Sequence, residues 1–215
     1  MTMQSIAVCG AGTMGAGIAQ IAAYSGLQTL LFDIQPESLT RAEAQIEKSL
    51  GTAVEKGKLT TDEKEKVLQR IKFTTVIEDC AADVIIEAIV EKIAAKRALF
   101  NQLAAINTAT TVFATNTSSL SVSEIAAAVT SHPSRVVGMH FFNPVPLMAL
   151  VEVISGLATA PAVADTVFAT AAAWGKNPVH ARSTPGFIVN RVARPFYAEG
   201  LRLLSEQAAD PATLD

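Results

Sequence analysis

The first part of the chain alternates between short apolar runs and a segment of small residues. "SIAVCG" (5–10) is an apolar run that ends in glycine, "AGIAQIAAYSG" (16–26) resembles a helix that stops at Gly26, and "QTLLFD" (28–33) is a second apolar run ending in an acid. Short apolar runs bounded by glycine are typical of buried strands. The pattern therefore predicts a strand, a helix and a second strand, as in a βαβ unit.

Further apolar runs predict more strands of the same sheet. They lie at 83–90, 111–116, 135–142 and 149–156. Strands that are apolar almost throughout belong to a sheet covered on both faces. We therefore predict a doubly wound α/β domain.

A charged segment between the second strand and "KFTTV" predicts an inserted pair of helices, at about 36–57 and 61–71. Gly57 would end the first helix, and "TTDE" resembles the capped start of the second. On composition alone, this 36–71 hairpin is a solvated arm.

The last part of the chain predicts a helix at 160–173, a short edge strand in "KNPVHA" and a helix from Pro185 and Gly186 to about Gln207, bent at Pro195. One such helix cannot bury its apolar residues by itself. We expect it to pack on the preceding domain, on a partner chain or on residues outside this sequence. We predict one domain over 1–184 and the start of a helical domain over 185–215.

Composition favours neither a nucleic-acid nor a membrane partner. Of the 215 residues, 50% are hydrophobic, and the formal net charge is −3, so there is no basic surplus. No apolar run approaches the length of a membrane span. Cys9 and Cys80 lack metal-ligand spacing and fit a reducing compartment. We expect a cytoplasmic protein without a metal site.

"GAGTMG" places Gly10, Gly12 and Gly15 in a G-x-G-x-x-G pattern between the first strand and the first helix. Such glycines allow a tight turn, close approach of a pyrophosphate, and close packing of helix on strand. Asp33 follows Gly15 by 18 residues, and no arginine stands beside it. A carboxylate there binds a ribose 2'-hydroxyl and repels a 2'-phosphate, which predicts NAD rather than NADP. The alternative is a structural turn followed by a solvent-facing acid.

Glu152 lies inside the apolar run "LMALVEVI" and therefore needs a buried partner. His132 precedes a proline in a polar turn, and His180 is in the edge element, whereas His140 ends a neighbouring buried strand. We predict a His140–Glu152 pair, in which the carboxylate fixes one ring nitrogen and leaves the other as a base. By residue statistics, His140 alone would more often be a core histidine.

In an open α/β sheet the ligand binds in a crevice at the carboxyl ends of the strands. We expect His140 and several small polar residues to face this crevice. Asn116 and Ser118 follow a predicted strand in "ATNTSSL". Their alternative role is a turn and cap before "SVSEIAAAV". Asn190, a poor helix former within "FIVNRV", is either a ligand contact or a partner of an interior kink.

The motifs "GAGTMGAGIAQ", "EAIVEKIAAK", "NTSSL", "HFFNPVP", "LVEVI" and "TPGFIVNR", in this order, resemble the (S)-3-hydroxyacyl-CoA dehydrogenase family, including its 3-hydroxybutyryl-CoA type. The resemblance covers nearly the whole chain. It implies a Rossmann-type domain and oxidation by NAD of the 3-hydroxyl group of an acyl-CoA thioester. A cofactor that accepts hydride makes a metal unnecessary for this reaction.

The resemblance also implies roles for individual residues. His140 would be the base, Glu152 its orienting carboxylate, and Ser118 and Asn190 would hydrogen-bond the reacting substrate. The implied cofactor contacts are Gly10, Gly12, Thr13, Met14, Gly15, Asp33, Glu91, Lys96, Asn116, Ser118 and Asn143. Ser49 and Lys56, with Ser118, would contact coenzyme A, so the arm would be a clamp in part.

Family members carry a longer helical C-terminal domain that closes the site and forms a homodimer. The resemblance implies that 185–215 is the start of that domain. Ala149 stands where the family has a lysine or another polar residue. The alternatives are a catalytically silent NAD-binding protein of the same fold, as in lens crystallins, although such a protein would not need the base, and an inactive fragment of the enzyme. We also expect Pro144 and Pro146 to hold the turn between base and carboxylate rigid.

Overall fold

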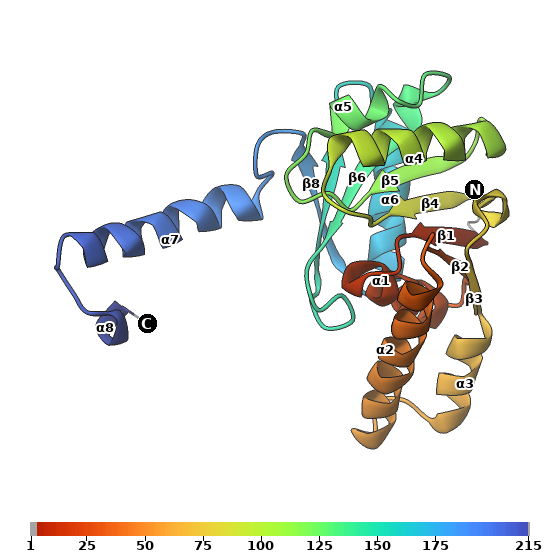
Figure 1. Cartoon of the computed structure of the whole chain (residues 1–215), viewed down its shortest axis with the longest axis horizontal. Coiled ribbons are helices and arrows are strands. Elements are labelled where there is room, and N and C mark those ends of the chain that lie inside the picture. The colour runs from red at the N-terminus through yellow and green to blue at the C-terminus, as the bar shows by residue number, and fades with distance from the viewer. Residues whose placement is uncertain (1–3, 215) are drawn as a thin grey trace.

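One eight-stranded sheet organises the computed structural model, which describes residues 4–214 (Figure 1). The strands are β1 (Ser5–Cys9), β2 (Gln28–Phe32), β3 (Ile71–Thr74), β4 (Val84–Glu87), β5 (Val112–Thr115), β6 (Val136–Phe141), β7 (Leu150–Ser155) and β8 (Asn177–Arg182). Their order in the sheet is β3-β2-β1-β4-β5-β6-β7-β8, and only the β6–β7 pair is antiparallel. The predicted α/β class is confirmed.

Helices connect the strands and cover both faces of the sheet. They are α1 (Thr13–Tyr24), α2 (Pro36–Glu55), α3 (Thr61–Gln69), α4 (Ile93–Ile106), α5 (Val122–Ala126), α6 (Pro161–Ala173), α7 (Val189–Ser205) and α8 (Pro211–Leu214), with 3-10 turns at Ile77–Asp79 and Pro133–Arg135. None of these helices is both long and apolar enough to cross a membrane.

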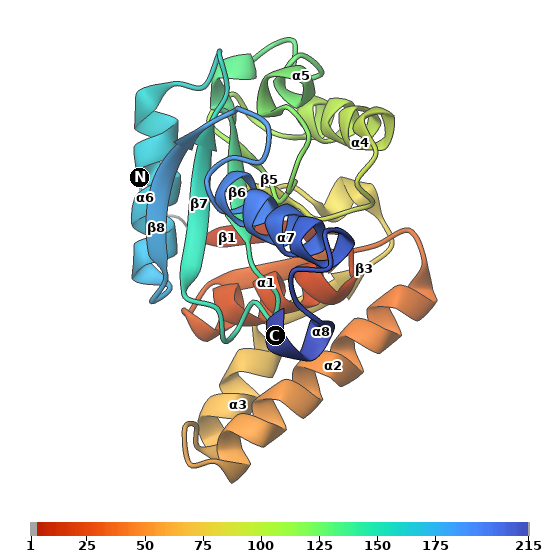
Figure 2. The same cartoon turned by 90° about the vertical axis from the view of Figure 1, so that its left-hand side faces the viewer.

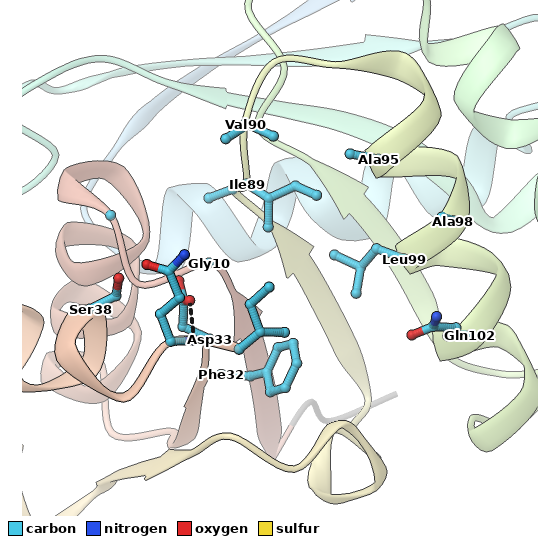
Figure 3. Close-up of a pocket in the computed structure, with 14 residues that line it drawn as sticks. Gly10, Phe32, Asp33, Ser38, Ile89, Val90, Ala95, Ala98, Leu99 and Gln102 are labelled. Atoms are coloured by element: carbon cyan, nitrogen blue, oxygen red, sulfur yellow. Dashed lines mark hydrogen bonds between the residues drawn. The ribbon is translucent and has the colours of Figure 1, made fainter.

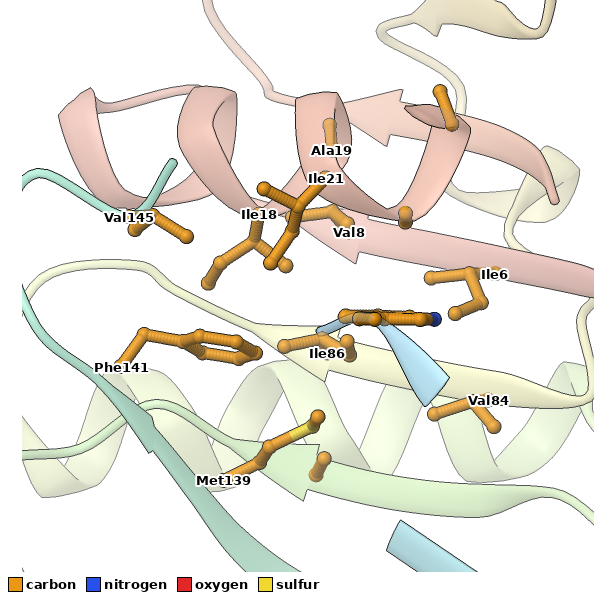
Figure 4. Packing of buried hydrophobic residues seen from close by; sticks show 14 of the residues in the cluster. Ile6, Val8, Ile18, Ala19, Ile21, Val84, Ile86, Met139, Phe141 and Val145 are labelled. Carbon is orange, nitrogen blue, oxygen red and sulfur yellow. The ribbon is translucent and has the colours of Figure 1, made fainter. Parts of the chain in front are cut away.

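Alternate residues of the central strands β1, β4 and β5 belong to two separate hydrophobic cores. On one face, Ile6 and Val8 of β1 pack with α1, α2 and α6, as Figure 4 shows for Val8 and Ile18. On the other face, Ala7 of β1 packs with α4 and α5, including Phe100. This alternation is the period-two pattern of a sheet that is buried on both faces.

The arm formed by α2 and α3 packs by one face and is not simply solvated. Leu39, Ala42, Ile46 and Leu50 recur every three or four residues along α2 and are all buried. They face α1 and α3 within the first core. Thr60 and Glu63 form the reciprocal cap that "TTDE" predicted. Residue 71, which we expected to end the second helix, instead begins β3.

α7 extends away from the sheet in Figure 1, and in Figure 2, which is turned by 90°, it lies in front of the sheet. None of its residues is buried, and Val192, Phe196, Tyr197 and Leu201 are each at least two-thirds exposed. Of the packing partners considered for this helix, the preceding domain is therefore not the one used in this structure.

A buried ion pair joins β4 to α4 beneath the second face of the sheet. The ammonium of Lys96 lies 2.6 Å from Glu87 and 3.1 Å from Glu91, and Lys96 and Glu87 are almost wholly buried. The other carboxylate oxygen of Glu87 accepts a hydrogen bond from Thr115, its partner in β5. Burying a carboxylate at this depth is costly unless such partners are present.

Lys96→Met should destabilise the fold strongly, because it leaves Glu87 buried without its counter-charge. The expected loss in the free energy of unfolding is about 3–5 kcal/mol, measured by urea denaturation near neutral pH. Arg97→Met removes a charge from the exposed side of the same helix and should cost within about 0.5 kcal/mol. Equal losses in the two variants would contradict this role of Lys96.

Glu91→Gln should lower stability at neutral pH but not in strong acid. Burial raises the pKa of Glu91, but the hydrogen bond from Thr117 and the charge of Lys96 outweigh burial and lower the pKa to about 2. The ionised carboxylate therefore stabilises the folded state above its ordinary pKa of 4.5, and this contribution disappears as pH falls toward 2.

The measurement is the difference in unfolding free energy between wild type and Glu91→Gln at a series of pH values. It should shrink between about pH 4.5 and pH 2. Glu47→Gln, on the exposed side of α2, controls for the loss of one charge. A Glu91→Gln difference that stays constant with pH would show that the carboxylate is not held in this way.

Candidate functional site

The G-x-G-x-x-G segment forms the turn between β1 and α1, and its backbone requires glycine at two positions. Gly10 has φ of +109°, and a Cβ there would lie 2.6 Å from the carbonyl oxygen of Ala88. A Cβ on Gly15 would lie 1.7 Å from the carbonyl oxygen of Gly10. A Cβ on Gly12 would meet no atom within 4 Å, so a ligand can approach the backbone there. The turn fits a pyrophosphate at the N-terminus of α1.

Asp33 lies at the end of β2 beside this turn. One of its carboxylate oxygens accepts the Ala11 N–H at 2.8 Å, and the other accepts the Gln35 N–H at 2.9 Å. Asp33 therefore fixes the glycine turn through these hydrogen bonds, and it also lines a cavity beside the turn.

A cavity of about 510 Å³ opens between this turn and α4 (Figure 3). Apolar side chains such as Ile34, Ile89 and Leu99 form much of its wall, and Asp33 is its one charged lining residue among those described. Its size and lining fit a nucleoside. A 2'-phosphate would meet Asp33 without a lysine or arginine in the wall.

His140 and Glu152 lie directly opposite each other because β6 and β7 run antiparallel. The ring Nδ1 of His140 lies 2.7 Å from a Glu152 oxygen, and both side chains are buried. The predicted contact between these two side chains is present, and the role of His140 as a base stays a prediction. Since Nδ1 is engaged by the carboxylate, Nε2 is the nitrogen left for a substrate.

The second oxygen of Glu152 accepts the backbone N–H groups of Ile188 and Val189, each at 2.9 Å. Burial raises the pKa of Glu152, but the hydrogen bonds from His140, Val189 and Ile188 outweigh burial and hold the pKa below its ordinary value. Glu152 therefore stays ionised and binds both the histidine and the first turn of α7.

Two aromatic rings limit the movement of the His140 ring. Phe142 lies 4.6 Å from it and Phe187 lies 5.9 Å from it, measured between ring centroids. Phe187 is 4% exposed and has φ of +49°, a backbone conformation that non-glycine residues seldom adopt. The loop before α7 is therefore shaped to place this ring against the histidine.

Ser118 and Asn190 meet at the carboxyl end of β5. The Asn190 side-chain amide donates to the carbonyl oxygen of Ser118 at 3.2 Å. Asn116 accepts the Phe141 N–H at 2.8 Å, beside His140. The cap of α5 comes from Ser121, so Asn116 and Ser118 do not serve as the helix cap that we considered.

The remaining predicted contact residues are spread over several elements around Ser118, α1 and the arm. Glu91 accepts the N–H groups of Ser118 and Ser119, whereas Lys96 is buried behind it. Thr13 and Met14 begin α1, and Asn143 is exposed after β6, next to a cis peptide bond with Pro144. Ser49 and Lys56 lie on the arm, where Lys56 is exposed and Ser49 is partly exposed. The ligand contacts of all these residues stay predictions.

Two supporting residues were missed from the sequence. Glu87 ends a strand that reads as apolar, and its acid signals a buried partner in the way that Glu152 does. The ammonium of Lys176 donates to the carbonyl oxygens of Val145 and Met148 at 2.6 and 2.9 Å. It thereby fixes the turn between β6 and β7, but nothing in the sequence pattern of "GKNPVH" signals this role. Among the described residues, no cluster of three or more His, Cys, Asp or Glu side chains could hold a metal ion.

The arrangement combines a buried, carboxylate-bound histidine with a turn that fits a dinucleotide, and such a pair could remove a proton from a hydroxyl group. The chain is similar to known proteins. The 3-hydroxyadipyl-CoA dehydrogenase of Escherichia coli K12 is 51% identical over 216 residues, covering 100% of this chain and 45% of the relative. A probable 3-hydroxybutyryl-CoA dehydrogenase of Bacillus subtilis is 44% identical, covering 100% of this chain and 75% of the relative.

The fold is similar to solved structures as well. The crystal structure of (S)-3-hydroxybutyryl-CoA dehydrogenase from Ralstonia eutropha matches with a TM-score of 0.97 at 39% identity, covering 100% of this chain and 76% of that one. The chain thus spans less than half the length of the E. coli relative and about three-quarters of the other two. The family model described as "3-hydroxyacyl-CoA dehydrogenase, NAD binding domain" matches residues 5–184. The chain belongs to the 3-hydroxyacyl-CoA dehydrogenase family and contains its NAD-binding domain.

Proposed function

We propose that the protein oxidises the 3-hydroxyl group of an (S)-3-hydroxyacyl-CoA to a 3-oxo group with NAD. The observation that carries this proposal is the buried His140–Glu152 pair at 2.7 Å. A protein that only binds NAD has no need of an oriented base. The printed names of the relatives give hydroxyadipyl-CoA and hydroxybutyryl-CoA as their substrates, which supports an acyl-CoA here.

NAD, when bound, would accept the hydride that leaves the 3-carbon of the substrate. Residues of this chain fit it: the turn from Gly10 to Gly15 offers backbone N–H groups to the pyrophosphate, and Asp33 faces the ribose of the adenosine. Met14, Glu91 and Asn143 are further contacts implied by the family resemblance.

The histidine takes the proton in this mechanism. Nε2 of His140 accepts the 3-hydroxyl proton, while Glu152 at Nδ1 stabilises the imidazolium that forms. Ser118 and Asn190, which touch each other, hydrogen-bond the substrate oxygens and orient the 3-carbon. The thioester's coenzyme A extends toward Ser49 and Lys56 on the arm.

The assembly and location belong to the same proposal. Val192, Phe196, Tyr197 and Leu201 of α7 are exposed, and burial of their apolar surface would favour further contacts. A helical C-terminal domain that forms a homodimer accounts for this surface. The low content of cysteine, with both thiols free and buried, supports the reducing environment of the cytoplasm.

His140→Gln in the full-length protein should lower kcat by about 10²- to 10⁴-fold, because the glutamine cannot accept the hydroxyl proton. The assay follows the oxidation of NADH by acetoacetyl-CoA. His180→Gln, which changes an exposed histidine stacked on Phe168, is the matched control and should keep normal turnover.

Two results would overturn this mechanism: no turnover by wild type, or full turnover by His140→Gln. If the wild type binds NADH but neither binds nor reduces acetoacetyl-CoA, the silent NAD-binding alternative holds.

Asp33→Asn should narrow the preference for NADH over NADPH. The neutral amide no longer repels a 2'-phosphate, and it can accept only one of the N–H groups from Ala11 and Gln35. We expect weaker NADH binding and a ratio of dissociation constants that moves toward one by about tenfold or more. Calorimetric titration with both cofactors measures the ratio. Asp62→Asn, on the exposed start of α3, should leave it unchanged, and an unchanged ratio in Asp33→Asn would remove Asp33 from cofactor selection.

A further inference from the structure

A second cavity, of about 450 Å³, adjoins the residues that would hold the substrate. Ser118 and Asn190 form one part of its wall, and Arg191 and Arg194 of α7 form another. The loop residues Pro185 and Gly186 also line it. The cavity therefore begins at the proposed reaction site and continues to two guanidinium groups.

The two arginines have no counter-charge within the described part of the chain. Arg191 and Arg194 are three residues apart in α7, so their side chains are neighbours on the helix surface. Neither forms an ion pair with a described residue, whereas Arg202 of the same helix pairs with Glu199 and Glu206. The wall of the cavity contains no described Asp or Glu.

The nearby carboxylate of Glu91 does not neutralise this charge. One of its oxygens accepts the N–H groups of Ser118 and Ser119, and the other lies 3.1 Å from Lys96. Glu91 is therefore committed to the loop and to the buried lysine. The cavity keeps the positive potential of its two arginines, and an anion would be attracted there.

The position of the cavity in the sheet indicates which part of the substrate enters it. The arm with Ser49 and Lys56 lies between β2 and β3, at one edge of the sheet. The cavity is formed by segments that follow β5 and β8, and β8 is the opposite edge. In an extended acyl-CoA, the thioester and the acyl tail leave the 3-carbon in opposite directions. With coenzyme A toward the arm, the tail points toward Arg191 and Arg194.

We infer that the acyl group of the substrate ends in a carboxylate, which Arg191 and Arg194 bind. The inference rests on the proposed function and adds the substrate class: (S)-3-hydroxyacyl-CoA esters of dicarboxylic acids. A planar guanidinium offers two parallel N–H groups to a carboxylate. Both arginines are exposed, so a methyl-ended tail would leave them hydrated and gain nothing from them, whereas a carboxylate would gain an ion pair; the site should therefore favour a tail that ends in a carboxylate.

The test compares two substrates whose acyl groups both have six carbons, (S)-3-hydroxyadipyl-CoA and (S)-3-hydroxyhexanoyl-CoA, in the full-length protein. Wild type should favour the adipyl ester by about tenfold or more in kcat/KM. Arg194→Met should reduce this preference by about tenfold, mainly through a higher KM for the adipyl ester. Arg194→Lys should retain part of the preference, because the charge remains without the planar fork.

Arg202→Met is the matched control, since it removes the same side chain from the same helix outside the cavity, and it should leave the preference unchanged. The inference is wrong if wild type does not prefer the adipyl ester. It is also wrong if Arg194→Met lowers kcat/KM for both esters by the same factor. The arginine would then bind a group that both esters share, such as a phosphate of coenzyme A.

Failure of the proposed function gives a different result. Wild type would then turn over neither ester, and the inference would be decided by the dissociation constants of the two esters. If wild type binds the adipyl ester more tightly than the hexanoyl ester, and Arg194→Met removes this difference, the result would support the carboxylate site. Equal dissociation constants would overturn it.

Discussion

The antiparallel pairing of β6 with β7 is the constraint on which the site depends. It sets His140 opposite Glu152 and places a carboxylate where water cannot solvate it. A buried carboxylate needs several donors, and the structure supplies them from the His140 ring and from the backbone of Ile188 and Val189. One acid therefore fixes the base and the start of α7 together.

The same principle operates at β4, where a second buried acid connects separate elements. Glu87 binds Thr115 in β5 and Lys96 in α4, and Lys96 in turn faces Glu91. Glu91 then holds the backbone of the loop that contains Ser118. Two polar networks thus meet at the Ser118 loop, because Asn190 of α7 donates to the carbonyl oxygen of Ser118. The geometry around Ser118 and Asn190 is set by elements that lie far apart in the sequence.

Local signals were sufficient for some of these features and insufficient for others. The glycine turn, Asp33 and the strands were predictable because the residues that determine them are close in sequence. The His140–Glu152 pair was predictable because the chain offers few buried partners for an acid. The role of Lys176 could be interpreted only with the fold known, since its partners lie 31 and 28 residues away in the sequence. Glu87 was missed because it ends a run that otherwise reads as an apolar strand, although its partner Lys96 is nine residues away. α4 was not predicted, although Phe100 and Leu103 show its helical spacing.

The start of α7 connects the chemistry to the choice of substrate. Val189 is held by Glu152, Asn190 by the Ser118 loop, and Arg191 and Arg194 follow on the next turn. Because the helix is anchored at its first residues, its arginines keep a fixed direction relative to His140. The remainder of α7 makes no buried contact with the domain, so it can support further helices without disturbing the base. A change at Arg194 would therefore alter the contact proposed for the acyl tail while leaving the His140–Glu152 hydrogen bond intact, so binding of the tail and orientation of the histidine depend on different residues.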